Sequence, residues 1–234
     1  MSDKFSRTEM LLGTENMKKL KTAHVAVFGL GGVGGHIVEA LARSGIGELT
    51  LIDADTIAKS NLNRQIIATY ETLNMNKTDA MKNRILSINP DIKVHTRELF
   101  YLPENADNLP LEAYNYVADA IDTVSAKIEL AVRCEKLGIP LISSMGTGNK
   151  LDPTALTVTD IYKTSGCPLA RVMRHELKNR GVKALKVVYS EEKPIKPIFT
   201  QDSPSKKSPP GSCAFVPSVA GLIIASEIIK DLCK

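Results

Sequence analysis

The sequence predicts an α/β fold: a Rossmann-like, doubly wound, mostly parallel sheet with a nucleotide-binding glycine turn and additional C-terminal strands. Three observations support this. Short apolar runs alternate with helical patterns over the first 144 residues. The turn Gly29-Leu30-Gly31-Gly32-Val33-Gly34 directly follows the apolar run 24–28, and a second run, 49–52, ends at Asp53. The 234 residues are also enough to bury a large core as one domain, 1–234.

Each expected strand is a short apolar run bounded by glycine, proline or polar residues, and each expected helix has apolar residues at helical spacing. After Gly148, β-branched residues predict further strands, and a closing apolar helix is long enough to pack back on the sheet. The expected strands are 24–28, 48–53, 92–97, 115–121, 139–144, 153–163 and 184–190, and the expected helices are 33–43, 77–88, 126–137, 168–181 and 216–232.

The glycine turn predicts a phosphate site at the start of the helix that follows it. Backbone N–H groups can approach a phosphate closely there, and the helix dipole favours negative charge. Asp53, at the end of the next strand, is placed to accept hydrogen bonds from ribose hydroxyls. The motif alone leaves the nucleotide open, and a nicotinamide cofactor is one alternative.

The residues beyond Asp53 favour a nucleoside triphosphate. The chain continues through Asp55 and Ser60-Asn61-Leu62-Asn63-Arg64-Gln65 to Lys77, which begins a helix, so two cations and an amide follow the turn. The run 117–121 ends at Asp122, near the edge where open α/β sheets bind ligands. Asp122 is therefore a candidate Mg²⁺ ligand.

These motifs together resemble the adenylating domain of the ThiF/MoeB superfamily, relatives of ubiquitin-activating enzymes. The resemblance covers about residues 5–150 and rests on separated elements in the right order. The segments 7–13, 122–127 and 167–170 are most similar to the branch of tRNA threonylcarbamoyladenosine dehydratases. That resemblance implies ATP and Mg²⁺ as cofactors, a tRNA substrate rather than DNA, and adenylation of a carboxylate.

The resemblance also implies roles for individual residues. Arg64 and Lys77 would neutralise the phosphates, Asn61 would contact phosphate or ribose, and Asp55 is a further candidate for the metal. Arg7 would reach across a twofold interface to the nucleotide of a second copy, so the active unit would be a homodimer. A sulfurtransferase-like protein is a further candidate partner. The expected nucleotide-binding set is Gly29, Gly31, Gly32, Gly34, Asp53, Asp55, Asn61, Arg64 and Lys77, with Arg64, Lys77, Asp122 and Arg7 as the catalytic set.

Positive charge is concentrated in a basic insert, residues 160–211. The whole chain carries a net charge of +4, whereas residues 160–210 hold eleven Lys and Arg against five Asp and Glu. The helix expected there places Arg171, Arg174 and Lys178 on one face, which suits a phosphate backbone but is also typical of a solvated helix face. The part rich in Pro, Ser and Lys, 191–211, is expected to be mobile.

Cysteine and histidine spacing predicts no zinc site and no disulfide framework. The four cysteines form no C-x-x-C pair, unlike many relatives that activate sulfur carriers, and the histidines share no metal-ligand spacing. Cys167 follows Ser165-Gly166 in a loop and is a candidate nucleophile, the alternative being a small loop or core residue. The polar first residues and the short uncharged run 214–226 favour a cytoplasmic protein over a secreted or membrane-bound one.

Two other functions stay open. One is an adenylyltransferase for the C-terminus of a ubiquitin-like sulfur carrier, which would need a groove for a flexible protein tail and a reactive loop cysteine. The other is a non-catalytic nucleotide-binding scaffold. A scaffold would not need Arg64, Lys77 and Asp122 together, so their presence argues against it.

Overall fold

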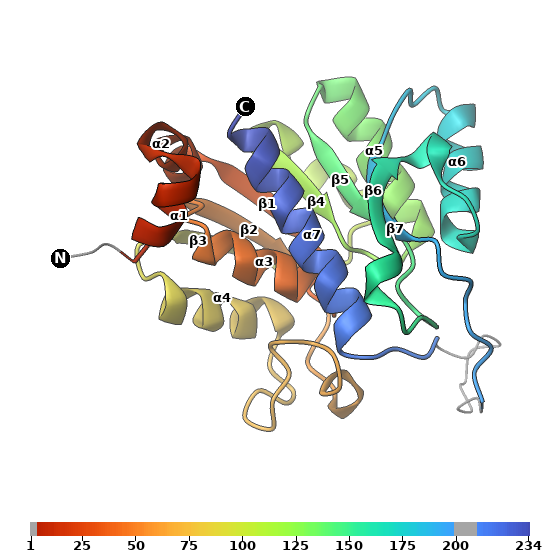
Figure 1. Cartoon of the computed structure of the whole chain (residues 1–234), viewed down its shortest axis with the longest axis horizontal. Helices are drawn as coiled ribbons and strands as arrows, with labels where there is room; N and C mark the ends of the chain where they lie inside the picture. The colour runs from red at the N-terminus through yellow and green to blue at the C-terminus, as the bar shows by residue number, and fades with distance from the viewer. Residues whose placement is uncertain (1–3, 199–209) are drawn as a thin grey trace.

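A computed structural model describes residues 4–198 and 210–234. One seven-stranded sheet, with the strand order β3-β2-β1-β4-β5-β7-β6, runs through the molecule (Figure 1). Every neighbouring pair is parallel except β7 and β6. The strands are β1 (His24–Phe28), β2 (Glu48–Ile52), β3 (Lys93–Arg97), β4 (Tyr116–Asp119), β5 (Leu141–Ser144), β6 (Leu156–Asp160) and β7 (Lys186–Ser190).

Helices cover both faces of the sheet. One face packs against α2 (Thr14–Thr22), α3 (Gly34–Arg43), α4 (Lys77–Ile88) and α7 (Phe215–Leu232), which share one apolar core. The other face packs against α5 (Val124–Leu137) and two 3₁₀ segments, and α6 (Pro168–Asn179) extends this layer. Burial on both faces explains why the central strands read as continuous apolar runs.

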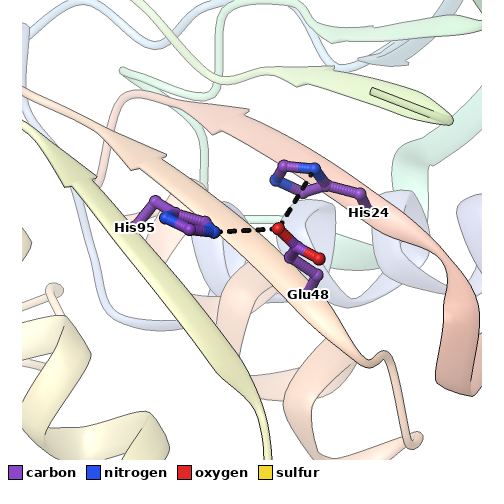
Figure 2. Close-up of side chains that lie close together, drawn as sticks. All are labelled: His24, Glu48 and His95. Atoms are coloured by element: carbon purple, nitrogen blue, oxygen red, sulfur yellow. Dashed lines mark hydrogen bonds and ion pairs between the residues drawn. The ribbon is translucent and has the colours of Figure 1, made fainter. Parts of the chain in front are cut away.

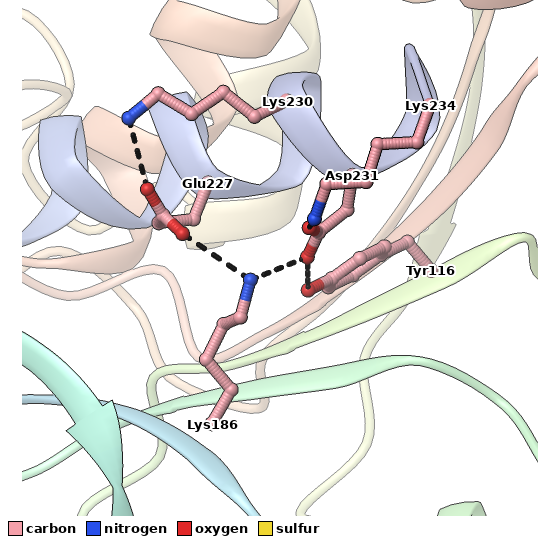
Figure 3. Close-up of polar contacts among 6 residues, drawn as sticks. All are labelled: Tyr116, Lys186, Glu227, Lys230, Asp231 and Lys234. Carbon is pink, nitrogen blue, oxygen red and sulfur yellow. Dashed lines mark hydrogen bonds and ion pairs between the residues drawn. The ribbon is translucent and has the colours of Figure 1, made fainter.

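The last helix, α7, is held to the sheet by polar contacts as well as by its apolar face (Figure 3). Lys186 on β7 donates to Asp231 at 2.6 Å and to Glu227 at 3.2 Å, and the Tyr116 hydroxyl donates to Asp231 at 2.8 Å. Burial raises the pKa of Asp231, but the hydrogen bonds from Lys186, Lys234 and Tyr116 outweigh it and hold the pKa at about 2. Asp231 is therefore ionised and ties β4 and β7 to α7.

The structure confirms the predicted fold class and most of the predicted elements. The region 153–163 is shorter as a strand than predicted, because 3₁₀ turns at Pro153–Ala155 and Ile161–Lys163 flank β6. Two helices, α1 (Ser6–Leu12) and α2, precede β1 and were not anticipated. About half of the predicted mobile segment 191–211, residues 199–209, lies outside the described residues.

The part of that segment that is described makes defined contacts. Lys150 donates to the carbonyl of Glu192, whose carboxylate accepts from the backbone of Leu151 and Asp152. Ile195 donates its N–H to the Asn149 carbonyl at 2.7 Å. Within the described ranges, no helix is both long enough and apolar enough to cross a membrane.

Candidate nucleotide-binding site

The glycine turn between β1 and α3 is so tight that two of its positions have no room for a side chain. Gly29 has φ +85°, and a Cβ there would lie 2.8 Å from the carbonyl oxygen of Ala120. A Cβ on Gly34 would lie 1.7 Å from the oxygen of Gly29. Gly34 therefore shapes the turn, whereas Gly29, Gly31 and Gly32 line the cavity in front of it. The turn lies where the strand order reverses between β1 and β4, the usual ligand position in such sheets.

Asp53 links the glycine turn to the loop that follows β2. Its Oδ2 accepts from the N–H of Leu30 at 2.6 Å, and its Oδ1 accepts from the N–H of Asp55 at 2.8 Å. Each carboxylate oxygen has two lone pairs, so both can still accept a hydroxyl of a ligand. Asp53 thus both holds the turn and remains able to bind a ribose.

Lys77 is a buried cation at the first position of α4. Its Nζ lies 2.6 Å from Asp55 Oδ2 and 3.7 Å from Asp53 Oδ1, and the residue is only 5% exposed. A buried lysine without an anion would be costly, so the two aspartates hold its charge in place. The ammonium is thereby fixed at the cavity wall.

A cavity of about 320 Å³ joins these groups at the carboxyl ends of the strands. That volume is within the range of small-molecule sites. Of the predicted nucleotide-binding residues, all except Gly34 line it, and Asp122 lines it too. Its wall includes Gly29, Gly31, Gly32, Asp53, Asp55, Asn61, Arg64, Lys77, Leu99, Phe100, Tyr101, Asp122, Thr147 and Ser212.

Asn61 and Arg64 enter the cavity from the long connection between β2 and α4. The Asn61 Oδ1 accepts from the N–H of Ala58, so its Nδ2 is the atom that can donate to a ligand. Arg64 donates through Nη1 to Ser60 O and Asn63 Oδ1, and its side chain packs beside Gly32. The Arg64 side chain therefore lines the cavity beside Gly32, and Ser60 and Asn63 hold its guanidinium.

A buried ion pair supports the loop that carries Asp122. Lys127 Nζ lies 2.9 Å from Asp119 Oδ2, both side chains are almost fully buried, and Ser143 Oγ donates to the same oxygen at 2.5 Å. The network also holds the loop backbone: Lys127 donates to Ile121 O, and the Ile121 N–H donates to Asp119 Oδ1, both at 3.1 Å. Asp122 follows directly and is exposed at the cavity.

Four predicted residues lie away from this cavity. Arg7 is exposed on α1 and does not line it. On α6, Arg171 and Lys178 are exposed, but Arg174 is half-buried and donates to the carbonyl and hydroxyl of Thr164. Arg174 is thus partly engaged in holding α6 to the preceding loop.

The environment of Cys167 is apolar, whereas the neighbouring residues in the sequence predict a polar one. The residue is 3% exposed and packs in an apolar cluster with Met145, Ala170 and Met173. It directly precedes Pro168, the first residue of α6, and belongs to the same buried apolar cluster as residues of that helix. This burial agrees with the alternative of a core residue rather than a loop nucleophile.

Comparison with known proteins gives the family. The model of the ThiF family matches residues 5–234. The chain belongs to the ThiF family. Among curated ThiF relatives, the tRNA threonylcarbamoyladenosine dehydratase of Bacillus subtilis is 43% identical, with 100% of this chain and 96% of the relative covered. The enzyme of that name from Escherichia coli is 34% identical, with 98% and 93% covered.

One similar ThiF structure was solved with a bound nucleotide. The crystal structure of E. coli tRNA N6-threonylcarbamoyladenosine dehydratase, TcdA, in complex with ATP matches with a TM-score of 0.87 and 34% identity. The match covers 98% of this chain and 93% of that chain. The fold, including the strands after Gly148, is therefore that of a ThiF protein solved with ATP.

Sequence reasoning missed several groups around the cavity of this ThiF chain. Leu99, Phe100 and Tyr101 follow β3 and supply an apolar wall, but nothing in their spacing separates them from an ordinary loop. Gln65 is buried, and its Oε1 has no hydrogen-bond partner among the described residues. The only sequence signal for Gln65 was its position directly after Arg64 in a run of polar residues.

Proposed function

We propose that this protein uses ATP to dehydrate threonylcarbamoyladenosine in tRNA, by adenylating the carboxylate of the modified nucleoside and releasing AMP and pyrophosphate. One observation carries the proposal: five separated segments bring glycine backbone, two cations, an amide and three carboxylates to one cavity. Full-length relatives that carry the dehydratase name support the choice of substrate.

The residues around the cavity fit a triphosphate. Backbone N–H groups of the glycine turn and the side chains of Arg64 and Lys77 bind its phosphates, and Asp53 accepts from the ribose hydroxyls. The apolar wall at 99–101 suits the base. Lys77 is fixed by Asp53 and Asp55 beforehand, so little side-chain entropy is lost when phosphate binds.

The charge of the cavity makes Mg²⁺ the natural companion of ATP. Among the described residues that line the cavity, the carboxylates Asp53, Asp55 and Asp122 outnumber the cations Arg64 and Lys77, so a bare triphosphate would meet net repulsion from them. Carboxylate and phosphate oxygens are the ligands that Mg²⁺ prefers. Asp122 is the proposed metal ligand, with Asp55 as a second candidate.

The reaction needs positioning and charge neutralisation more than it needs a protein nucleophile. A carboxylate oxygen of the substrate attacks the α-phosphate, and pyrophosphate leaves. The carbamoyl group of the same nucleoside then closes the ring on the activated carbonyl, and AMP leaves with the former carboxylate oxygen. The product is lighter by one water, and burial of Cys167 is consistent with a route without an enzyme thioester.

The basic insert is the proposed tRNA surface, with Arg171 and Lys178 exposed for the phosphate backbone. The proposed active unit is a homodimer in which Arg7 of one copy reaches the nucleotide of the other. A sulfurtransferase-like protein is a proposed further partner.

The test combines Mg²⁺, radiolabelled ATP and either total tRNA or sulfur-carrier proteins, with AMP release followed alongside mass spectrometry of tRNA nucleosides. We expect AMP only with tRNA, together with a nucleoside lighter than threonylcarbamoyladenosine by one water. AMP formed only with a carrier protein would favour the adenylyltransferase. Absence of turnover with either would favour the scaffold.

A further inference from the structure

Two histidines and a glutamate, His24, Glu48 and His95, lie close together on neighbouring strands of the sheet (Figure 2). His24 and Glu48 are the first residues of β1 and β2 and lie directly opposite each other, and His95 on β3 is paired with Thr50. The side chains therefore project from one face of three adjacent strands. The histidine spacing in the sequence predicted no shared site, but the register of the sheet places these two together.

The nitrogen and oxygen atoms of this cluster are close enough to share one ion. His95 Nε2 lies 2.8 Å from Glu48 Oε1, and His24 Nδ1 lies 3.6 Å from the same oxygen. One potential ligand atom from each residue lies within 4.8 Å of the others. Ligands of a tetrahedral zinc at about 2.0–2.2 Å are separated by about 3.3 Å, so small side-chain rotations suffice.

A hydrogen bond to a buried hydroxyl orients the ring of His24 for a metal. His24 Nε2 lies 2.8 Å from the hydroxyl of the buried Thr50, whose oxygen can accept the Nε2 hydrogen and leave the Nδ1 lone pair toward Glu48.

We propose that His24, Glu48 and His95 bind one Zn²⁺ ion across β1, β2 and β3, beside the amino ends of β1 and β2. The donor set of two imidazoles and one carboxylate is a known zinc set with a fourth position left for water, and it differs from the all-oxygen set that Mg²⁺ prefers. The His95 side chain is 44% exposed, so solvent reaches the fourth position. Thr50 acts through His24 as a positioning residue.

The ion would cross-link three neighbouring strands. Lys93 lies 3.9 Å from the other carboxylate oxygen, Glu48 Oε2, which leaves Oε1 for the metal. Five residues of β-strand rise place the Cα of His24 about 16 Å from that of Gly29 in the glycine turn. Zinc binding can therefore be measured without ATP or tRNA, and its outcome does not depend on the proposed function.

The test is titration of the metal-free full-length protein with Zn²⁺ by calorimetry and with Co²⁺ by visible absorption, near neutral pH. We expect one equivalent to bind, intense tetrahedral Co²⁺ bands, and a Tm that rises with Zn²⁺ concentration as the ion stabilises the folded state. His95→Gln and Glu48→Gln should each weaken Zn²⁺ binding by about 100-fold, and Thr50→Val by about 10-fold.

His36→Gln and His175→Gln are the matched controls, because both histidines lie outside the cluster and should leave affinity unchanged. All variants keep the four cysteines, so binding by thiols would survive His95→Gln and Glu48→Gln. Binding that is undiminished in those variants would overturn the proposal, and so would failure of the folded wild-type protein to bind Zn²⁺. In either case the cluster would be an ion-pair network only.

Discussion

Lys77 is the residue whose environment sets the clearest functional expectation. Replacement by Met removes the cation between Asp53 and Asp55 at the cavity wall. We expect ATP-dependent adenylation to fall by about 10²–10³-fold, the usual effect of losing one preorganised charge at a reacting centre. AMP release with saturating tRNA measures this.

Lys82→Met is the matched control for that variant. Lys82 lies on the same helix but does not line the cavity, so its loss should leave AMP release within about twofold of wild type. Circular dichroism of both variants checks that the fold is kept. A folded Lys77→Met protein with wild-type rates would remove Lys77 from the proposed site.

Lys127 acts at a distance from the cavity, through the buried network beneath Asp122. Lys127→Met leaves the Asp119 carboxylate buried without its cation. We expect a loss of about 3–5 kcal/mol in the free energy of unfolding, measured by urea denaturation. The double variant Asp119→Asn/Lys127→Met should recover part of that loss because it leaves no unpaired charge. A double variant no better than the single one would assign the loss to packing instead.

At the scale of elements, the central strands and the helices α3, α4, α5 and α7 were predictable, since apolar periodicity and glycine punctuation act locally. The meeting of Asp53 and Asp122 at one cavity was predictable for a related reason: they follow β2 and β4, and parallel strands bring their carboxyl ends to one edge. The pairing of Lys127 with Asp119 was not, because a lysine on a helix is usually solvated. The insertion of β7 between β5 and β6 depends on long-range packing that no local pattern encodes.

The attachment of α7 predicts a pH dependence of stability. The folded pKa of Asp231, about 2, is below the ordinary aspartate value of about 3.9. The contribution of ionised Asp231 to the free energy of unfolding is therefore complete above about pH 4 and is lost as the pH falls toward about 2. Lys186→Met should reduce the free energy of unfolding by on the order of 2 kcal/mol near neutral pH, and the difference from wild type should shrink as Asp231 becomes protonated.

Lys230→Met is the control for this pH dependence, because Lys230 pairs with Glu227 from a mostly exposed position. We expect a change below about 1 kcal/mol at any pH. Urea denaturation across a pH series measures both variants. A pH-independent effect of Lys186→Met would mean that Lys186 acts through packing rather than through charge.

Helix α6 carries two exposed cations of the basic insert, Arg171 and Lys178. Arg171→Glu/Lys178→Glu should weaken tRNA binding and lower the slope of log affinity against log salt by about 1 for each phosphate that is no longer neutralised. Lys136→Glu, on the exposed end of α5, is the control for the change of charge. Binding measured by filter retention across a salt series separates the two cases. Equal slopes for all three proteins would place the tRNA on another surface.

For the whole molecule, the two ends of the sheet have different chemistry. The carboxyl end has a cavity lined by charged side chains, several of which are held by hydrogen bonds. The amino end combines His24, Glu48 and His95 on strands that are already fixed by the sheet. Because the strands are short and parallel, a metal at one end would stabilise the scaffold without entering the cavity at the other.

The position of Arg7 makes the oligomeric state testable by complementation. Arg7 is exposed on α1 and lies outside the cavity of its own chain, so the proposed role requires a second copy. Arg7→Ala and Lys77→Met should each be inactive alone. In a mixed dimer, one site would combine an intact Lys77 with the intact Arg7 of the other copy, and the second site would lack both.

An equal mixture after exchange of subunits contains half mixed dimers, each with one of two sites intact, so about a quarter of wild-type AMP release should return for a twofold assembly. Mixing Lys77→Met with Asp122→Ala is the control. Both residues serve the cavity of their own chain, so every site stays defective and no activity should return. Recovery in neither mixture, with exchange verified by mass spectrometry, would place Arg7 outside the partner's site and leave each chain as its own catalytic unit.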